Sequence, residues 1–405
     1  MRVYQPVKLS DYCEITSSKR IYAKEYIDSG VPFYRGKEIV ASFSGGEVSD
    51  PLFISENRFE EIKHRFGAPE KGDLLLTSVG TIGVPYRVTG EFDFYFKDGN
   101  LTWFRKLNGV DQNFLYYWLQ SPQGKAELSK CTIGAAQPAY TIERLKEISI
   151  ELPPENIQRD IASVIADYDI ALKNNRRRIQ LLEESARLLY QEWFIHLRFP
   201  GHEQVKIDDG VPEGWESTLL PDVIDVNPRT PAEKGKEIWY VPMSSLSESA
   251  MTAHTADFER RTNHTNVKFK KNDVLVARIT PCLENGKTGY VYFLAEDEVA
   301  CGSTEFIVLR GKRVPSEFVY CLARSYPFRE NAIKSMTGSS GRQRVQNSCF
   351  DKYAVPLPPK SILDEFVQIV QNNFEQIRNL MAQNAKLAQA RDLLLPKLMS
   401  GELTV

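Results

Sequence analysis

The chain has 405 residues, more than one ordinary hydrophobic core accommodates, so we expect at least two domains. Its composition, with 42% hydrophobic and 26% charged residues, is that of a globular protein, and no apolar run approaches the length of a membrane span. Six scattered cysteines without a Cys-x-x-Cys pair favour reduced thiols in a cytoplasmic protein over a disulfide framework or a zinc site. The formal net charge of −2 argues weakly against nucleic-acid binding, although an acidic total can hide a local basic face.

The first half is predicted to open with a mixed α/β segment over residues 1–150. Runs rich in β-branched and aromatic residues, flanked by glycine, aspartate or asparagine, predict strands at residues 73–79, 92–96 and 101–105. Apolar residues at helical spacing predict a helix over residues 112–119.

A long helix is predicted after Pro154. Its apolar residues alternate four and three positions apart, the spacing of a coiled-coil seam, and Asn175 is the only polar residue in the series. The apolar members of the series are Ile161, Ile165, Tyr168, Leu172, Ile179, Leu182, Ala186, Leu189 and Trp193. Because the segment has no interior proline or glycine, we expect a helix of roughly 40 residues, about 60 Å long.

A joint rich in proline and glycine, residues 199–214, leads into a second mixed segment at about residues 212–355. Its predicted strands are residues 273–279, 289–294 and 305–309, and its predicted helix is residues 316–323. A second long helix after Pro359 repeats the seam spacing with Leu363, Val367, Val370, Phe374, Ile377, Met381, Ala388, Leu395 and Leu398, and with Asn384 and Arg391 as polar members. Two such helices most simply pack on each other; the alternative is that each lies on its own domain.

The two halves share an internal repeat. The decapeptide Lys71-Gly-Asp-Leu-Leu-Leu-Thr-Ser-Val-Gly80 returns about 200 residues later as Lys271-Asn-Asp-Val-Leu-Val-Ala-Arg-Ile-Thr280. Leu152-Pro-Pro154 matches Leu357-Pro-Pro359, and Leu9-Ser-Asp11 matches Leu220-Pro-Asp222. Because these matches occur in the same order, we infer a duplication in which each half has a globular segment, a Leu-Pro-Pro junction and a long helix.

The sequence lacks the catalytic motifs for which we searched. Gly286-Lys287-Thr288 resembles the end of a P-loop, but Pro281 stands where that motif needs a glycine. Neither a glycine-rich dinucleotide fingerprint nor an Asn-Pro-Pro-aromatic tetrapeptide of amino-methylating DNA methyltransferases is found. Asp50, Glu61 and Lys63 have the spacing of a metal-dependent nuclease triad, a match that arises easily in a chain with this many charged residues. We therefore expect no catalytic residue and no metal site.

Residues suited to binding DNA gather in loops at equivalent places in the two halves. Arginine can bond guanine through two hydrogen bonds in the major groove, glutamine can do so with adenine, and lysine or hydroxyl groups suit phosphates. The alternative is that these loops and their cations are only solvated surface. The predicted DNA-contacting residues are Tyr34, Arg35, Lys37, Thr77, Ser78, Thr81, Gln137, Arg278, Thr280, Lys287, Arg342, Gln343 and Arg344.

Several short segments make the chain similar to a known family over nearly its whole length. The most specific are Pro32-Phe-Tyr-Arg-Gly-Lys-Glu38, Gly80-Thr-Ile-Gly83, Gln137-Pro138 and the ending Leu394-Leu-Pro-Lys-Leu-Met-Ser-Gly-Glu-Leu403. In these segments and in its repeat layout, the chain resembles the specificity subunit of type I restriction–modification systems. The resemblance implies two target-recognition domains held apart by an antiparallel pair of helices, each domain reading one half of a bipartite DNA sequence. It also implies that the helices dock two methyltransferase subunits, which bind S-adenosylmethionine, and that separate restriction subunits use ATP and Mg²⁺.

We therefore predict an α+β fold with a first target-recognition domain at residues 1–152, a first long helix at 153–198, a linker at 199–214, a second target-recognition domain at 215–357, and a second long helix and tail at 358–405. The helices are expected to form an antiparallel coiled coil whose seam includes Ile161, Ile165, Leu172, Asn175, Ile179, Phe374, Ile377 and Asn384. No cofactor and no catalytic centre are expected in this chain. The alternatives are a single-chain DNA methyltransferase or nuclease, and a coiled-coil adaptor that does not bind DNA.

Overall fold

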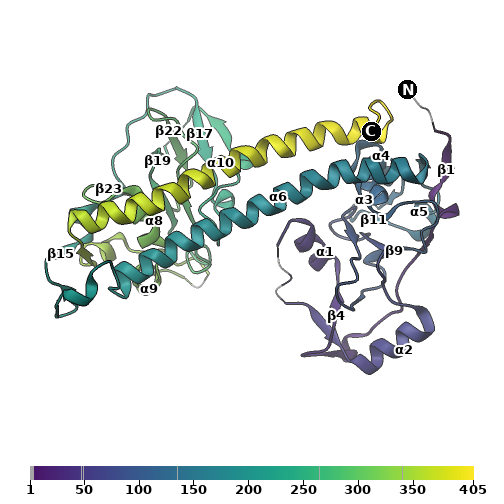
Figure 1. Cartoon of the computed structure of the whole chain (residues 1–405), viewed down its shortest axis with the longest axis horizontal. Helices are drawn as coiled ribbons and strands as arrows, with labels where there is room; N and C mark the ends of the chain where they lie inside the picture. Colours follow the sequence, from purple (N-terminus) through teal and green to yellow (C-terminus); the bar gives the residue numbers. More distant parts are fainter. Residues whose placement is uncertain (1–3, 47, 49, 135, 264, 340) are drawn as a thin grey trace. The chain divides into compact units, whose positions relative to one another are not determined.

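The computed structural model describes residues 4–46, 48, 50–134, 136–263, 265–339 and 341–405 (Figure 1). Its contacts divide the chain into two compact units, and the division falls within both long helices. The first unit comprises Met1–Asn174 and Asn384–Val405, and the second comprises Asn175–Gln383. Each unit therefore holds one globular domain together with part of each long helix.

The globular domain of the first unit contains two four-stranded sheets. The first sheet is antiparallel and contains, in spatial order, β2 (Glu14–Thr16), β9 (Leu101–Arg105), β6 (Leu74–Thr77) and β7 (Pro85–Arg87). The second contains β3 (Tyr26–Ile27), β5 (Leu52–Ile54), β4 (Val31–Tyr34) and β8 (Tyr95–Phe96), and only its β4–β8 pair is parallel among the described residues. All residues of β6 are buried, which explains its unbroken apolar run.

Helices and short strands complete this domain. Its helices are η1 (Leu9–Asp11), η2 (Ala23–Glu25), α1 (Gly36–Phe43), α2 (Glu56–Phe66), α3 (Gln112–Gln120), α4 (Pro122–Lys130) and α5 (Ile142–Leu145). The Asp111 carboxylate accepts hydrogen bonds from the backbone N–H groups of Asn113 and Phe114, which explains where α3 begins. Two antiparallel pairs remain: the hairpin of β10 (Thr132–Ile133) with β11 (Ala139–Tyr140), and β1 (Pro6–Lys8) with β12 (Ser149–Glu151). The first and last strands of the domain therefore lie side by side.

The globular domain of the second unit repeats this plan. Its first sheet contains β16 (Ile224–Val226), β23 (Phe306–Gly311), β20 (Val274–Ala277) and β21 (Thr288–Tyr290), and its second contains β18 (Glu259–Arg261), β17 (Ile238–Val241), β22 (Val299–Gly302) and β19 (Val267–Lys270). Its helices are α7 (Leu220–Val223), η5 (Met243–Ser245), η6 (Thr255–Asp257), α8 (Ser316–Arg324), α9 (Tyr326–Lys334) and η7 (Asn347–Phe350). Its first and last strands, β15 (Glu216–Leu219) and β24 (Ala354–Leu357), also pair with each other. The expected linker contains η4 (His202–Gln204) and the hairpin of β13 (Ile207–Asp208) with β14 (Val211–Pro212).

The duplication extends to individual backbone hydrogen bonds around the repeated decapeptide. The matching N–H to C=O bonds are Asp73 to Glu70 and Asp273 to Lys270, Val88 to Asp73 and Val291 to Asp273, Ser78 to Asn100 and Arg278 to Glu305, and Tyr140 to Ser78 and Val345 to Arg278. The predicted repeat is therefore confirmed at the level of the backbone.

The two halves differ in their second sheets. Three strands correspond, because each half has an antiparallel pair followed by a parallel pair: β5–β4–β8 in the first and β18–β17–β22 in the second. The fourth strand is β3, beside β5, in the first half, and β19, beside β22, in the second half. The fourth strand is thus added at opposite edges of the shared three.

The long helices are α6 (Glu155–Tyr190), continued by the π-helix η3 (Gln191–Ile195), and α10 (Lys360–Met399), which runs through Pro396. In the first unit, Ile161 and Ile165 near the start of α6 share a core with Leu398 near the end of α10. In the second unit, Trp193 lies after the end of α6, and its ring centroid is 6.0 Å from that of Phe366 near the start of α10. The helices therefore run antiparallel within each unit, and the predicted fold class is confirmed.

The structure buries most of the expected seam. The buried members are Ile161, Ile165, Leu172, Asn175, Ile179, Phe374 and Ile377, whereas Asn384 is half-buried. In α10 the inward set departs from the predicted spacing: Phe366 and Leu380 are buried, and Val367 and Met381 are only half-buried. The departure arises because α10 packs on the second globular domain as well as on α6, as the 6.4 Å between the ring centroids of Phe318 and Phe366 illustrates. The sequence left open whether each long helix packs on the other helix or on its own domain. In the structure both kinds of packing occur.

Within the part of the chain that the structure describes, we find no helix long and apolar enough to cross a membrane.

Candidate functional site

In the first unit, three separate segments meet where β6 ends. Val79, two residues beyond the strand, forms an isolated bridge with Ala139 of β11. The backbone N–H of Tyr140 donates to the carbonyl of Ser78 at 2.9 Å. The start of α1 lies here too, because a Cβ placed on Gly36 would be 4.0 Å from the Val79 carbonyl oxygen. We call this meeting point of β6, α1 and the β10–β11 hairpin the first edge.

The second unit has an equivalent edge where β20 ends. Ile279 bridges Arg344, and Arg344 also bridges Thr337, so Arg344 occupies the place that Ala139 has in the first edge. The backbone N–H of Thr280 donates to the carbonyl of Gln343 at 3.0 Å. This second edge brings together predicted residues that are far apart in the sequence: Arg278, Thr280, Gln343 and Arg344.

Three of the predicted DNA-contacting residues face the interior of the first unit. Thr77 is fully buried, and its hydroxyl accepts a hydrogen bond from the backbone N–H of Val84 at 2.9 Å. The Ser78 hydroxyl lies 2.7 Å from that of Thr102. Tyr34 is 6% exposed and belongs to an aromatic cluster, with its ring centroid 4.9 Å from that of Phe94. In this conformation the three side chains are not accessible to a ligand. We therefore assign them a structural role in supporting the first edge.

Two of the predicted arginines are held by acids of the chain itself. The guanidinium of Arg35 donates to the carboxylate of Glu38 at 2.6 Å, and Glu38 is only 2% exposed. Arg35 therefore compensates a buried charge at the start of α1. The guanidinium of Arg344 donates to the carboxylate of Glu305 at 2.8 Å, and this hydrogen bond raises the pKa of Arg344. The contact of Arg344 with Glu305 was not visible in the sequence, because 39 residues separate the two.

The remaining candidates are more accessible. Lys37, Thr81, Gln137 and Arg342 are exposed, and Lys287 and Gln343 are half-buried. Among the described residues, no hydrogen bond or ion pair engages the Arg342 side chain. Two atoms of the second edge, Nε of Arg278 and Oγ1 of Thr280, are buried without a hydrogen-bond partner in the described part of the chain. Such atoms need water or a ligand to satisfy them.

The hairpin of the first edge needs a glycine at its turn. Gly134 has φ = +81°, and a Cβ at this position would lie 2.6 Å from the carbonyl oxygen of Gln137. The tight turn places Gln137 on the exposed part of the hairpin. In the second edge the corresponding tract, residues 337–341, includes position 340, which lies outside the described residues.

The fold brings to the first edge two residues that the sequence did not indicate. The backbone N–H of Lys97 donates to the carbonyl of Tyr34 at 2.8 Å, so this half-buried lysine adjoins the start of α1. Tyr140 is also half-buried, and its hydroxyl would lie 3.0 Å from a Cβ placed on Gly83. No local signal indicated either residue, because each comes to the edge through pairing with a distant segment.

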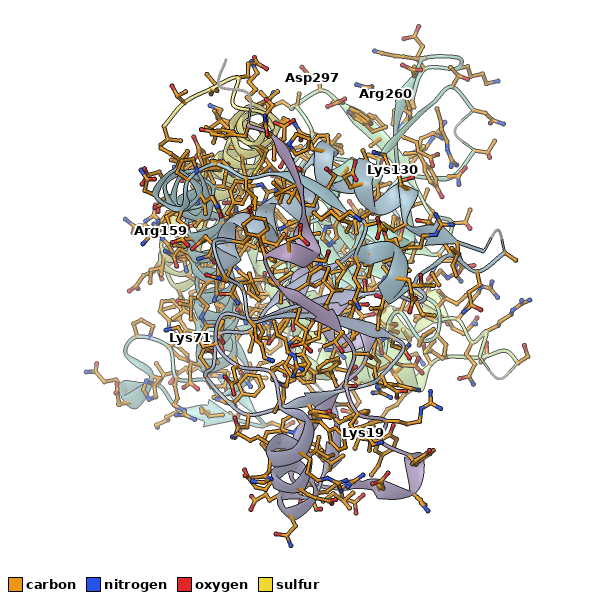
Figure 2. All side chains as sticks on the ribbon, turned by 90° about the vertical axis from the view of Figure 1, so that its right-hand side faces the viewer. Lys19, Lys71, Lys130, Arg159, Arg260 and Asp297 are labelled. Atoms are coloured by element: carbon orange, nitrogen blue, oxygen red, sulfur yellow. The ribbon has the colours of Figure 1, made fainter. Side chains whose placement is uncertain are left out.

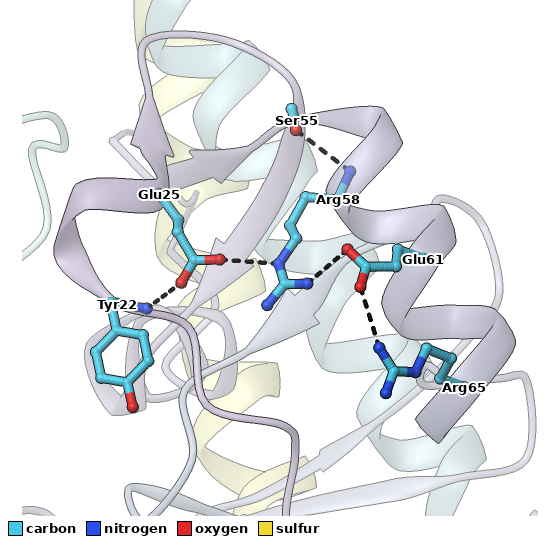
Figure 3. A network of polar contacts seen from close by, with 6 residues as sticks. All are labelled: Tyr22, Glu25, Ser55, Arg58, Glu61 and Arg65. Carbon is cyan, nitrogen blue, oxygen red and sulfur yellow. Dashed lines mark hydrogen bonds and ion pairs between the residues drawn. The ribbon is translucent and has the colours of Figure 1, made fainter.

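The nuclease-like triad is not assembled. Figure 3 shows the Glu61 carboxylate between two arginines, with Arg58 at 2.7 Å and Arg65 at 3.3 Å. These contacts, led by the hydrogen bond from Arg58, lower the pKa of Glu61. Lys63 pairs with Asp93 at 3.3 Å. Glu61 therefore belongs to an ion-pair network on α2, and no group of three or more potential metal ligands occurs among the residues that the structure describes.

The first unit has a cavity of about 650 Å³ that includes both acidic and basic residues. Lys71 and Arg159, labelled in Figure 2, line it together with Asp73 and Arg105. Burial raises the pKa of Asp73, whose carboxylate accepts a hydrogen bond from the Trp103 indole at 2.8 Å. Because acidic and basic residues line this cavity together, it does not indicate the chemical class of a ligand.

A known protein family matches this chain in two segments, as the duplication of the edges leads one to expect. The family described as the type I restriction modification DNA specificity domain matches residues 1–184 and 212–389. The chain belongs to this family. Each of the two matched segments contains one globular domain and most of one long helix.

Individual relatives match either nearly the whole chain or a part of it. The type I restriction enzyme MjaIX specificity subunit of Methanocaldococcus jannaschii is 26% identical over 420 residues, which cover 98% of this chain and 93% of that protein. The EcoEI specificity subunit of Escherichia coli is 30% identical over 158 residues, which cover 37% of this chain and 26% of that protein. A crystal structure of the S subunit of a type I restriction–modification system from M. genitalium superposes with a TM-score of 0.55 at 14% identity, covering 98% of this chain and 96% of that one. At this identity, the superposition shows a shared fold alone.

Proposed function

We propose that this chain is the DNA-recognition subunit of a type I restriction–modification enzyme and that it reads a bipartite site. One observation carries the proposal: the chain builds the same edge twice, from the same backbone hydrogen bonds, and furnishes each copy with different side chains. Two related domains that recognise different half-sites require the same backbone arrangement with different side chains. The chain's membership of the DNA specificity-domain family indicates that the ligand of these edges is DNA.

The exposed side chains suit the two kinds of contact that such a reader makes. Lys37 and Thr81 of the first edge suit phosphate oxygens, and Gln137 suits the major-groove edge of adenine. Arg342 of the second edge, unengaged within the described part of the chain, suits guanine. Arg344 would need to leave Glu305 before it could bond a base, so we assign it a supporting role.

The long helices are proposed to dock two methyltransferase subunits, which associate with restriction subunits. Catalysis then belongs to these partners, which would bind S-adenosylmethionine and use ATP with Mg²⁺, and this chain would hold no cofactor. The relatives named above are specificity subunits, in keeping with a role in recognition. We place the assembly in the cytoplasm, where its DNA lies.

The test is to co-express the chain with its methyltransferase subunit and to map the methylated sites across a genome. We expect a split motif with two specified halves and an unspecified spacer. Replacing residues 1–150 with the equivalent domain of a relative should change one half of the motif and leave the other as it was. If both halves change together, the two readers are not independent, and if no new methylation appears, the proposed function is wrong.

Purified protein distinguishes the alternatives. A single-chain enzyme would modify or cut DNA without any partner. A coiled-coil adaptor would show no DNA affinity that falls steeply with salt, whereas a reader that contacts phosphates should show it.

A further inference from the structure

A second site of distinct chemistry lies in the second unit, and its lining residues differ from those named for the second edge. A cavity of about 290 Å³ opens between the last turns of α6, with η3, and the junction of α8 with α9. Arg187, Arg324 and Arg329 line it, with Glu184 as the one acidic lining residue. We call this cavity the arginine pocket.

Arg324 is fixed deep in the pocket. Its side chain is only 5% exposed, and its guanidinium donates to the carbonyl of Gly286 at 2.7 Å. The nearest acid that pairs with it is Glu183, at 4.0 Å. The Glu183 carboxylate is already engaged by the hydroxyl of Tyr320 and by the backbone N–H of Met251. Among the described residues, Arg324 therefore has no ion pair shorter than the 4.0 Å to Glu183.

Neither of the other two arginines forms an ion pair within the part of the chain that the structure describes. Arg329 donates to the carbonyl of Glu284 at 3.0 Å, but its Nε is buried without a partner among the described residues. Burial, followed by the positive charges of Arg324 and Arg187, lowers the pKa of Arg329. For Arg187 the described part of the chain provides no hydrogen bond or ion pair. Ser325, Tyr326 and Pro327 at the start of α9 also line the pocket, and a helix N-terminus carries partial positive charge.

The rim of the pocket is apolar. Tyr326 is 74% exposed and Leu188 is 53% exposed, although both are large apolar side chains. Leu181, Leu188 and Ile195 are exposed at intervals of seven residues, so they follow one side of the helix. Arginine and tyrosine side chains side by side are typical of a protein interface, where these two residue types are enriched among those that dominate the binding energy.

We propose that the arginine pocket binds a carboxylate side chain of the methyltransferase subunit, presented on an apolar segment that covers Leu188 and Tyr326. The inference rests on the proposed function, which supplies that partner. Arginine bonds a carboxylate with two parallel hydrogen bonds, and a site partly closed to water strengthens the pairing. A DNA phosphate would satisfy the charge but would leave the apolar rim exposed, so the rim favours protein.

Among the described residues, the arginine at position 187 has no counterpart in the first unit. At the spacing of 205 residues that relates the starts of α6 and α10, Arg187 corresponds to Asp392, and Leu188 corresponds to Leu393. Leu393 is 60% exposed, so both units keep the apolar position, but the first unit has Asp392 where the second unit has Arg187. The two methyltransferase subunits should therefore be held unequally, with only one of them anchored in the pocket.

The experiment uses the full chain and its purified methyltransferase subunit. Arg187→Ala should weaken the association of one subunit at least about tenfold, so that native mass spectrometry detects complexes with one methyltransferase subunit where the wild type carries two. Arg187→Lys, which keeps the charge, should retain part of the second association. Lys352→Ala, which removes an exposed cation outside the pocket, is the matched control and should assemble as the wild type does. Melting temperature and the affinity of the isolated chain for DNA should not change in any variant.

Each other result has a distinct meaning. Unchanged two-subunit assembly of Arg187→Ala, or loss of both subunits together, would overturn the pocket proposal. A fall in DNA affinity, with a salt dependence reduced by about one phosphate contact and with normal subunit assembly, would identify a phosphate site in its place. If the wild-type chain itself binds no methyltransferase subunit, the proposed function fails and the pocket proposal fails with it.

Discussion

Two aspartates at equivalent places in the repeat are stabilised by different partners. Asp273 is 1% exposed, and its carboxylate bonds the guanidinium of Arg310 at 2.6 Å. Asp73 is held by the Trp103 indole, while Arg105, the counterpart of Arg310, pairs with Glu14. The same backbone turn is therefore stabilised by a buried ion pair in one half and by a neutral donor in the other.

This difference predicts unequal effects of one substitution. Asp273→Asn would leave Arg310 without its acid and should lower the free energy of unfolding of its domain by about 3 kcal/mol. Burial raises the pKa of Asp73, so its ionised form costs stability at neutral pH, and this cost shrinks as the pH falls. Asp73→Asn, which is always neutral and can still accept from Trp103, should therefore change stability by about 1 kcal/mol or less. Urea unfolding of the two variants measures both values, and an equal loss would refute the contrast.

The candidate site shows how far residue-level prediction from sequence reaches. The loops that form the two edges could be located from the repeat, because the duplication marks equivalent positions. The direction of Thr77 could not be predicted, since β6 is buried on both faces and the usual alternation of polar and apolar residues is missing. The pairing of Arg344 with Glu305 could not be predicted either, because 39 residues separate the two and only the tertiary fold brings them together.

Among the elements, the long helices depend on a few fully buried positions. Ile165 of α6 is 0% exposed and lies in the core of the first unit, whereas Ile170 on the same helix is 55% exposed. Ile165→Ala should cost about 3 kcal/mol of stability, because it removes buried methyl groups and leaves a cavity. Ile170→Ala, the matched control, should change stability by less than about 0.5 kcal/mol. Thermal unfolding of the two variants provides the comparison, and similar melting temperatures would exclude Ile165 from the seam.

Elements with a strong local pattern were predicted well. Residues 101–105 form β9 at the predicted positions, and α3 and α8 extend the predicted helices by one residue each. The second sheet of each domain was largely missed. Tyr95–Phe96 lies within the predicted strand at residues 92–96, but strands such as Tyr26–Ile27 and Leu52–Ile54 are only two or three residues long, so no periodicity can develop in them. Their stability comes from pairing with distant strands, which a single sequence does not display.

At the scale of the whole molecule, the first unit is completed by the far end of the chain. Leu395, Leu398 and Met399 of α10 pack in the core that contains Ile161 and Ile165. A fragment of residues 1–200 lacks this cover, and an exposed seam of that kind favours association. We predict that the fragment forms a dimer through α6 and, with methyltransferase subunits, modifies a palindrome made of two copies of the first half-site.

Light scattering and methylation mapping test the fragment. Ile165→Asp in the same fragment is the control and should yield a monomer, because a charge in the seam opposes pairing. A soluble monomer without the substitution, or a dimer that modifies a non-palindromic site, would contradict the prediction.

The pairing of each domain's first strand with its last has a consequence for inheritance. Pro6 faces Glu151 across β1 and β12, and Glu216 faces Leu357 across β15 and β24, so the chain enters and leaves each domain at neighbouring points. A genetic crossover at these two points would exchange a whole domain without requiring the long helices to move. Under the proposed function, a lineage that carries this gene could thus acquire a new half-specificity in one recombination event, while its methyltransferase and restriction genes remain unchanged.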